Sequence, residues 1–404
     1  MKPSPLRFPN VARCTGSAGP HSLLLGLSLS ELRALAVDLG EAPFRGNQLY
    51  GWIYAKKAAD FEEMTNVPKG FRRALAERFV MGRREPRSVS VSSDGTRKYL
   101  YPVAESPATG FPATARSGAV EAALIPEGER LTLCVSTQVG CRRGCLFCRT
   151  GKQGFHGNLG PGDILNQFLS LPEREKVTNV VFMGMGEPLD NLEATLRALE
   201  LLTDPEGIGL SSRRITVSTV GIHPALETFL EATKVNLAVS LHSPFPEERR
   251  LLMPVEASHP LGKTIALIRR RREDTQRKLS MEYTLFSGLN DTPDHAEAVV
   301  RLLTGLSVRV NVIPYHPIDT GPVGVAQRTI EPPGPGPSAL DLRPPCPAAV
   351  TEFQQKLRDR GLRTFVRRSR GEDIGAACGM LWTGGNGGGL SGLEIEPLSP
   401  DFDR

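Results

Sequence analysis

Three of the seven cysteines stand close together, at a spacing that suits a metal cluster. Cys141, Cys145 and Cys148 form a Cys-x3-Cys-x2-Cys run with Phe147 before the last thiol. Three thiolates at this spacing can bind three irons of a cubane iron–sulfur cluster and leave the fourth iron open to a ligand. Zinc is the alternative, but a zinc site usually takes a fourth ligand from a second pair, and no other Cys-x2-Cys or His-x3-His occurs. The loop therefore predicts an open-sided four-iron cluster.

Glycines and polar residues follow three further apolar runs that we interpret as strands. In Gly184-Met185-Gly186-Glu187-Pro188, the glycines would let the backbone approach a ligand, and Glu187 could accept hydrogen bonds from an ammonium group. Ser218-Thr219 and Ser240-Leu241-His242 supply hydroxyl and imidazole groups at corresponding positions. An isolated His242 would more commonly be a core histidine, so the set as a whole predicts a ligand site.

These residues need a sheet that brings the ends of its strands together. From residue 131 onward, apolar β-branched runs alternate with helical segments, namely Leu192 to Leu202, Ala225 to Thr233 and His295 to Leu303. The predicted strands are Leu131 to Ser136, Val177 to Met183, Ile215 to Val220, Val235 to Leu241, Leu279 to Phe286 and Val308 to Ile313. Such βα units in series predict an α/β fold, a parallel sheet curled into a partial (β/α)6 barrel with the chemistry on its carboxyl-end loops.

A helical unit and a small β element precede the predicted barrel. Ser28-Leu29-Ser30-Glu31 is a capping box before a helix that ends near Gly40, and Ser93-Asp94-Gly95 is a hairpin turn between two short strands, Ser88 to Ser92 and Lys98 to Pro102. We predict a disordered start (1–24), a helical accessory domain (25–82), a short β bridge (83–125), the barrel (126–383) with a Pro-rich insertion (317–347), and a disordered tail (384–404).

Length, composition and charge are typical of a soluble enzyme. The 404 residues suffice for a large core plus a smaller domain, and no apolar run reaches membrane-spanning length. An odd number of cysteines at metal-type spacing favours a reducing cytoplasm over a disulfide framework. The first 30 residues hold no acidic side chain, which leaves an organellar leader as an alternative. The net charge is only +5, but basic clusters could contact phosphates, namely Arg72-Arg73, Arg249-Arg250, Arg269 to Arg272, and Arg367-Arg368 with Arg370.

The order of the motifs along the chain is also informative. After the cluster loop and its flanks come Phe182 to Leu189, Val217-Ser218-Thr219, Ser240-Leu241-His242 and Thr364 to Cys378; before it come Ile125-Pro126-Glu127 and Leu133-Cys134-Val135-Ser136. This pattern resembles the RlmN/Cfr family of RNA adenosine methyl synthases within the radical S-adenosylmethionine (SAM) superfamily, and most resembles its RlmN branch. Phe44-Arg45, Gln48-Leu49 and Trp52-Ile53-Tyr54 resemble that family's helical accessory domain, so the resemblance covers about residues 25 to 383.

The resemblance implies two cofactors and a set of residues that bind them. Cys141, Cys145 and Cys148 would hold one [4Fe-4S] cluster, whose open iron binds the amino and carboxylate groups of SAM. Reductive cleavage then yields a 5′-deoxyadenosyl radical, and a second SAM donates the methyl group. The residues that match SAM contacts are Gly186, Glu187, Ser218, Ser240, Leu241 and His242. An electron donor such as flavodoxin or ferredoxin is implied as a partner.

Three further residues match catalytic positions of the family. Adenine C2 is electron-poor and cannot attack the SAM methyl group, whereas a protein thiolate can. Cys378 matches the cysteine that takes this methyl group and carries it to the ring. Cys134 matches the cysteine that releases the product through a transient disulfide, and Glu121 matches the carboxylate that accepts the ring proton. Taken alone, each would more commonly be structural; Cys14 and Cys346 lie in irregular segments and receive no role.

One position departs from the family pattern. His316 stands where the family has an asparagine that contacts SAM, and imidazole can still donate or accept one hydrogen bond. The resemblance implies C2 methylation of adenosine in 23S ribosomal RNA, with transfer RNA open as a second substrate; the target base must leave its stack to reach Cys378. The alternatives are C8 methylation, a radical SAM enzyme acting on a peptide or small molecule, and an RNA-binding protein without catalysis.

Overall fold

The computed structural model describes residues 22–103, 118–271, 277–318 and 340–383. Cys14 and the predicted tail (384–404) lie outside these residues, as do most of the predicted start (1–24) and of the Pro-rich insertion (317–347). Across the described ranges, no helix is both long enough and apolar enough to cross a membrane.

The centre of the molecule is a ten-stranded sheet with the strand order β14-β13-β12-β11-β10-β9-β6-β5-β4-β3. The six predicted strands are present in chain order, as β6 (Arg130–Cys134), β9 (Asn179–Phe182), β10 (Ile215–Thr219), β11 (Asn236–Ser240), β12 (Leu279–Leu285) and β13 (Arg309–Pro314). All of them pair in parallel with their neighbours in that series, so their carboxyl ends meet at one edge. The predicted α/β fold class is confirmed.

A further parallel strand, β14 (Arg363–Val366), pairs with β13 and was not predicted from the sequence. It has four residues, of which Arg363 and Phe365 are exposed and only Thr364 is buried, so it lacks the apolar run that identifies a core strand. Its position at the sheet edge explains this composition, because an edge strand is covered on fewer sides.

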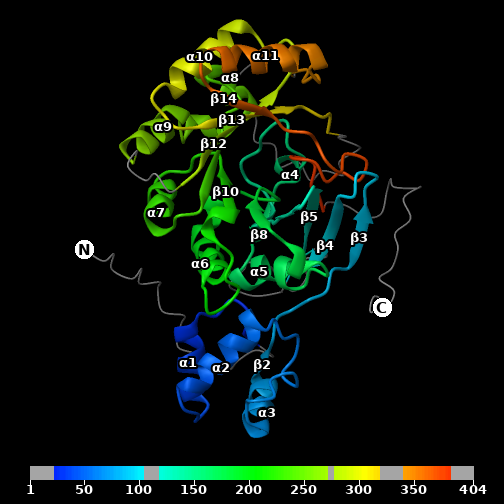
Figure 1. The fold of residues 1–404 in the computed structure, drawn as a ribbon, viewed down its shortest axis with the longest axis vertical. Helices are drawn as coiled ribbons and strands as arrows, with labels where there is room; N and C mark the ends of the chain where they lie inside the picture. Colours follow the sequence, from blue (N-terminus) through cyan, green and yellow to red (C-terminus); the bar gives the residue numbers. More distant parts are fainter. Residues whose placement is uncertain (1–21, 104–117, 272–276, 319–339, 384–404) are drawn as a thin grey trace.

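Helices lie along the parallel part of the sheet (Figure 1). They are α5 (Pro161–Leu169), α6 (Leu192–Thr203), α7 (Ala225–Ala232), α8 (Pro246–Leu252), α9 (Leu261–Arg270), α10 (Pro293–Leu303) and α11 (Pro347–Asp359). Short 3-10 turns span Arg174–Lys176, Pro188–Asn191, Ser212–Arg214 and Pro254–Ala257. β9 and β11 are nearly continuous buried runs, as expected for a parallel sheet that is covered by helices, whereas β10, β12 and β13 also carry polar residues.

The predicted β bridge extends this same sheet. β3 (Ser88–Val91) and β4 (Arg97–Pro102) form the predicted hairpin, with Gly95 at a φ of 84° that favours glycine. β5 (Ala119–Glu127) pairs antiparallel with both β4 and β6. The hairpin is therefore joined to the barrel through a continuous hydrogen-bonded ladder.

The amino-terminal helices lie below the barrel in Figure 1. They comprise α1 (Leu29–Asp38), α2 (Phe44–Tyr50), a π-helical turn (Gly51–Ala55) and α3 (Lys69–Arg78), with β1 (Ser22–Leu23) paired to β2 (Phe79–Val80). The predicted capping box is confirmed, because Ser28 Oγ accepts from Glu31 N and Glu31 accepts from Ser28 N. Tyr50 Oη donates to Asp204 at 2.5 Å and thereby joins this unit to the barrel.

Candidate active site

A cavity of about 560 Å³ lies at the carboxyl ends of the parallel strands. Most of the predicted site residues line it, namely Cys134, Cys141, Cys145, Cys148, Gly186, Glu187, Ser218, Ser240, His242, His316 and Cys378. Glu121 and Leu241 do not line it. Residues that are far apart in the sequence therefore converge on one space, as the strand-end argument predicted.

The cluster loop is held between two small elements. β7 (Gln138–Gly140) precedes it and pairs with β8 (Phe155–Asn158), while the short helix α4 (Arg149–Lys152) follows Cys148. Cys141 N donates to Gly154 O at 2.8 Å, and Cys148 N donates to Cys145 O at 3.1 Å. These bonds curl the loop so that its three thiols all line the cavity.

The three thiols fit a cubane cluster in number and environment. Burial raises the pKa of each above that of a free thiol, so bound metal would be needed to keep them as thiolates. Among the described residues, no three His, Cys, Asp or Glu side chains converge on a position for a single metal ion. In a cubane each thiolate binds a different iron, so convergence on one point is not required.

Glu187 is buried at the end of β9 and is held by backbone donors. Leu189 N donates to its Oε1 at 3.0 Å, and Val220 N donates to its Oε2 at 2.9 Å. Burial raises the pKa of Glu187 to about 7, against the effect of these bonds. Gly186, before it, has a φ of 99° and lies against Gln138, where a Cβ would come within 2.5 Å of the Gln138 side chain. The turn therefore requires glycine to bring Glu187 into the cavity.

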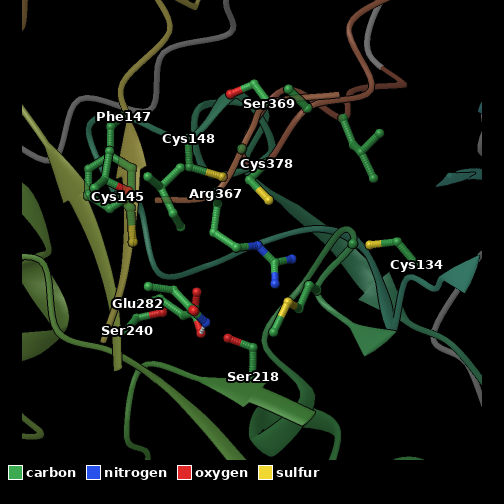
Figure 2. Close-up of a pocket in the computed structure, with 18 of the residues that line it drawn as sticks. Cys134, Cys145, Phe147, Cys148, Ser218, Ser240, Glu282, Arg367, Ser369 and Cys378 are labelled. Carbon is green, nitrogen blue, oxygen red and sulfur yellow. Dashed lines mark hydrogen bonds between the residues drawn. The ribbon is translucent and has the colours of Figure 1, made fainter. Parts of the chain in front are cut away.

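The ends of β10 and β11 present the other predicted ligand-binding groups. Ser218 and Ser240 line the cavity from neighbouring strands (Figure 2). His242 Nδ1 accepts from Thr284 N at 2.9 Å, and burial lowers the pKa of His242 to about 3, so its neutral ring carries the proton on Nε2. Leu241 is fully buried outside the cavity, with its carbonyl bonded to Arg249, so it contributes no side chain to this space.

Cys134 and Cys378 both line the cavity and are free thiols. Burial, with a smaller contribution from the neighbouring Cys378, raises the pKa of Cys134 to about 12. The Cys378 side chain is exposed to the cavity, and protein surrounds it on its other sides. This burial raises the pKa of Cys378, and the positive charge of Arg367 offsets part of the increase. The two thiols thus face each other across the site, and Figure 2 shows the Arg367 guanidinium between them and Ser218.

The residues around Cys378, which we call the Cys378 segment (367–383), contain no helix or strand. Before the thiol, Asp373 accepts from Ser92 Oγ at 2.6 Å and from Ser93 N at 3.1 Å, both in the β3–β4 turn. After the thiol, Arg149 N donates to Gly379 O at 2.7 Å, and Thr150 also donates to this part of the segment. The segment is therefore clamped on one side by the hairpin and on the other by α4.

Glu121 lies beside the Cys378 segment. Its Oε2 accepts from Trp382 N at 2.7 Å, and its Oε1 pairs with Lys98 Nζ at 2.9 Å. Burial raises the pKa of Glu121, while Lys98 lowers it. The carboxylate is close to the chain that bears Cys378 but lies outside the lining of the cavity.

His316 lines the cavity and joins β13 to the Cys378 segment. Its Nδ1 lies 3.2 Å from Glu372 Oε2, and its Nε2 is bonded to Ser369 Oγ. Contact with a ligand would therefore require one of these two bonds to open.

Two charged cavity residues, Glu282 and Arg367, were missed or misinterpreted from the sequence. Glu282 lies within a run interpreted as an apolar strand, and it accepts from Ser280 Oγ and Asn311 Nδ2, each at 2.8 Å. Arg367 was assigned to a phosphate-contacting cluster but extends into the cavity. A carboxylate in an otherwise apolar strand was the signal for Glu282.

Members of the other three predicted basic clusters are engaged within the protein. Arg72 is buried and bonded to Glu62, and Arg249 is only 1% exposed, so neither side chain is available to a phosphate. Adjacent arginines on a helix point in different directions, which the sequence pair alone does not reveal. Arg269 donates to Leu302 O, and Arg271 pairs with Glu231, so both are engaged within the protein.

Comparisons with known proteins extend over most of the chain. A family model described as the radical SAM superfamily matches residues 135–303, and one described as the ribosomal RNA large subunit methyltransferase N-terminal domain matches residues 23–81. The chain is 46% identical to a Porphyromonas gingivalis protein named probable dual-specificity RNA methyltransferase RlmN, over 89% of this chain and 97% of that protein. It is 39% identical to the dual-specificity RNA methyltransferase RlmN of Marinobacter nauticus, over 91% and 94%.

A solved structure is also similar. It is a radical SAM methyltransferase from Sphaerobacter thermophilus, with a TM-score of 0.77, 36% identity, and coverage of 90% of this chain and 99% of that one. The similarity therefore includes both the amino-terminal helices and the barrel.

Proposed function

The chain belongs to the RlmN family of radical SAM RNA methyltransferases, and we propose that it transfers a methyl group to C2 of adenosine in 23S ribosomal RNA, with transfer RNA as a second substrate. The observation that carries this proposal is the cavity itself. Besides the three thiols of the cluster loop, it contains Cys134 and Cys378, two further thiols that face each other. A radical SAM enzyme that only abstracts hydrogen would not need this second pair.

We propose that Cys141, Cys145 and Cys148 hold a [4Fe-4S] cluster and that the strand-end site binds SAM. The strand-end site comprises Gly186, Glu187, Ser218, Ser240 and His242. When bound and reduced, the cluster supplies the electron that cleaves SAM to a 5′-deoxyadenosyl radical. Glu187 accepts from the SAM ammonium group, and the two serines and the His242 Nε2–H provide further hydrogen bonds. Leu241 holds its neighbours in place, and His316 contacts SAM when one of its bonds to the Cys378 segment opens.

The thiol of Cys378 is proposed to be the group that carries carbon to the base. Its thiolate takes a methyl group from one SAM, which leaves as S-adenosylhomocysteine, and Arg367 favours that thiolate by its positive charge. Loss of one hydrogen atom from the S-methyl group to the adenosyl radical gives a methylene radical that bonds to adenine C2. The ring then carries a covalent link to the protein.

Release of the product is proposed to need the other two residues. Glu121 is proposed to accept the proton from C2, which requires the adenine base to reach beyond the present lining of the cavity; its raised pKa makes it a stronger proton acceptor than an exposed carboxylate. Cys134, as its thiolate, then attacks the Cys378 sulfur as the carbon–sulfur bond breaks, and the departing methylene carbon takes up a proton from solvent to become the methyl group. This leaves a Cys134–Cys378 disulfide that an external thiol must reduce. The ring adduct must lose one electron before its C2 proton leaves. If a bound cluster took that electron, the electron donor would be needed only to start the reaction, and the external thiol would supply two electrons in each turnover.

RNA is proposed to enter where the cavity opens beside β14. Phe365 is 49% exposed there, and Arg368 and Arg370 line the same cavity. Exposed aromatic side chains next to cations are suited to bases that have left their stack, because the ring stacks and the cations contact phosphates. Flavodoxin or ferredoxin is retained as the proposed electron donor.

The decisive experiment is nucleoside mass spectrometry of 23S ribosomal RNA and transfer RNA treated with the reconstituted enzyme, SAM and a reductant. We expect 2-methyladenosine. When the SAM methyl group is isotopically labelled, the new methyl group should contain its carbon and two of its three hydrogens. The product 8-methyladenosine would instead establish the C8 alternative, and unmodified RNA together with SAM cleavage would favour a different substrate. The Cys378→Ala protein is the matched control, because it retains the cluster loop and the strand-end site.

A further inference from the structure

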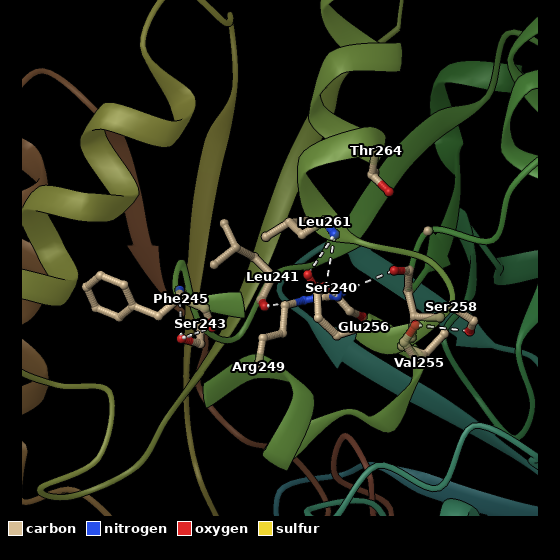
Figure 3. Close-up of polar contacts among 12 residues, drawn as sticks. Ser240, Leu241, Ser243, Phe245, Arg249, Val255, Glu256, Ser258, Leu261 and Thr264 are labelled. Carbon is tan, nitrogen blue, oxygen red and sulfur yellow. Dashed lines mark hydrogen bonds and ion pairs between the residues drawn. The ribbon is translucent and has the colours of Figure 1, made fainter. Parts of the chain in front are cut away.

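Arg249 is the largest of the fully buried side chains in the described residues, yet it carries a charge. Its guanidinium is bonded on every side (Figure 3). Nε donates to Leu241 O at 3.0 Å, and Nη2 donates to Ser240 O at 2.9 Å and Val220 O at 3.1 Å. Nη1 pairs with the carboxylate of Glu256, which is itself buried. One side chain thus connects the ends of two barrel strands to the segment after α8.

The carbonyl groups that Arg249 holds belong to the residues of the strand-end site or to their neighbours. Ser240 lines the cavity with its own side chain. The Val220 carbonyl accepts a hydrogen bond from Arg249, and the Val220 N–H donates to the carboxylate of Glu187 at 2.9 Å. Arg249 therefore lies behind both the glutamate and the serine that are proposed to bind SAM, and it sets the spacing of the strands that carry them.

Arg249 also lies close to the cluster loop. Leu252, at the end of the same helix, accepts at its carbonyl from Leu146 N at 3.0 Å, and Leu146 follows the cluster ligand Cys145. Burial raises the pKa of Cys145 and lowers the pKa of Arg249, and the attraction between the two side chains opposes both shifts, so the guanidinium lies near the cluster loop. The Glu256 carboxylate neutralises the guanidinium in a buried ion pair and also accepts a hydrogen bond from Leu261 N at 3.0 Å.

We propose that Arg249 and Glu256 form a buried charged brace with two effects on the proposed reaction: it fixes the spacing of the strand-end site and sets the reduction potential of the cluster. This inference rests on the proposed function. A fixed positive charge in a poorly polarisable interior favours an extra electron on a nearby cluster, and its counter-charge offsets that effect. Removing one partner of a buried ion pair is strongly destabilising, so the folding of each variant must be checked by circular dichroism before its potential and SAM affinity are compared.

The two members of the brace should shift the potential in opposite directions. In Glu256→Gln the arginine charge is uncompensated, so the midpoint potential of the reconstituted cluster should rise above that of the wild type. In Arg249→Met the unpaired Glu256 should take up a proton, so the positive charge is lost and the potential should fall. The measurement is a redox titration of the cluster followed by electron paramagnetic resonance.

The geometric effect is tested by Arg249→Lys, which keeps the charge but cannot reach three carbonyls and a carboxylate at once. It should keep the potential near that of the wild type and weaken SAM binding by about tenfold, measured by equilibrium dialysis. Arg250→Met is the matched control, because Arg250 is the next residue of the same helix but is exposed and paired with Glu247. It should match the wild type in both measurements.

Equal potentials in wild type, Glu256→Gln and Arg249→Met, or shifts of the same sign, would overturn the electrostatic effect. Unchanged SAM affinity in Arg249→Lys would overturn the geometric one. If Arg249→Met does not fold, the comparison of Glu256→Gln with Arg249→Lys still tests the electrostatic and the geometric effect. Only Glu256→Gln changes the net charge of the pair, so only it should shift the potential. A wild-type protein that assembles no cluster would instead contradict the proposed function.

Discussion

The strand-end site and the Cys378 segment face the same cavity but are built in different ways. Glu187, Ser218 and Ser240 belong to the ends of parallel strands or to the turns directly after them, and their backbones are fixed by the sheet and by Arg249. The Cys378 segment has no regular secondary structure and is held through side chains of a hairpin and of α4.

This difference matches what each region is proposed to do. A site that binds one ligand in one geometry benefits from preorganised groups, since little ordering is left to occur on binding. Cys378 must instead meet SAM, the base and Cys134 in turn. A segment that lies outside the helices and the sheet, and is joined to them at separate contacts, can move between such partners at a lower free-energy cost than a strand of the sheet. The contrast predicts how substitutions in the two regions should differ.

The largest effect is expected when the three cysteines of the cluster loop are replaced. The combined substitution of Cys141, Cys145 and Cys148 by alanine should lower iron and sulfide to background after anaerobic reconstitution and abolish SAM cleavage, because no ligand remains. Circular dichroism should stay close to that of the wild type, since the loop lies between elements that fold without it. Retention of the wild-type iron content would show that the metal is held elsewhere.

The next prediction separates the two thiols that face each other. Cys134→Ala should accumulate a covalent protein–RNA adduct, because Cys378 still bonds to the base but cannot be released, whereas Cys378→Ala should form none. Denaturing gel electrophoresis with labelled RNA distinguishes them. Normal turnover by Cys134→Ala, or methylation by Cys378→Ala, would contradict the proposed chemistry.

SAM binding at the strand-end site should depend on pH through the protonation of Glu187. Its pKa of about 7 means that the carboxylate needed by the SAM ammonium group is lost at lower pH, so SAM affinity should fall about tenfold per unit below pH 7. Glu187→Gln should bind SAM weakly at every pH, without that slope.

Stability of the ligand-free protein should change with pH in the opposite sense. The pKa of Glu187 is raised above its ordinary value, so its contribution is fully present below about pH 4.5 and is lost as pH rises through 7. Thermal unfolding of wild type compared with Glu187→Gln measures this. A SAM affinity independent of pH would exclude the glutamate from the site.

A smaller effect is expected where RNA is proposed to enter. Phe365→Ala should weaken RNA binding by about tenfold, whereas Phe365→Trp should retain it, because stacking needs an aromatic face. Val91→Ala is the control, as Val91 is also an exposed apolar residue but lies on β3. Fluorescence anisotropy with a target hairpin, without SAM, makes the comparison. Equal affinities would remove Phe365 from the interface.

The smallest effect concerns the clamp on the Cys378 segment. Asp373→Asn should keep one of the two bonds to the β3–β4 turn and weaken the clamp by about 1 kcal/mol. Hydrogen exchange should then be faster in residues 367–383 and unchanged in β10 and β11. Equal acceleration in both regions would mean that the segment is not held independently.

Much of this arrangement was predictable from the sequence, but not all. The cluster loop, the Glu187 turn and the serines at the carboxyl ends of β10 and β11 line one cavity, which spacing and strand ends could indicate because they are local patterns; their binding roles stay predictions. β14 was missed because an edge strand lacks an apolar run. Arg249 was misassigned to a surface cluster, since its partners are backbone carbonyls of residues that precede it in other elements.

The sequence by itself determined the number and spacing of the cluster thiols, the series of parallel strands and the family pattern, because each depends on residues close together in the chain. Only the tertiary structure decided which groups face one another. Cys134 meets Cys378, and Arg249 reaches Val220 and Ser240, because the strand order and the packing of α8 bring these atoms together. Such contacts depend on chain closure over long separations, which no local pattern of residues encodes.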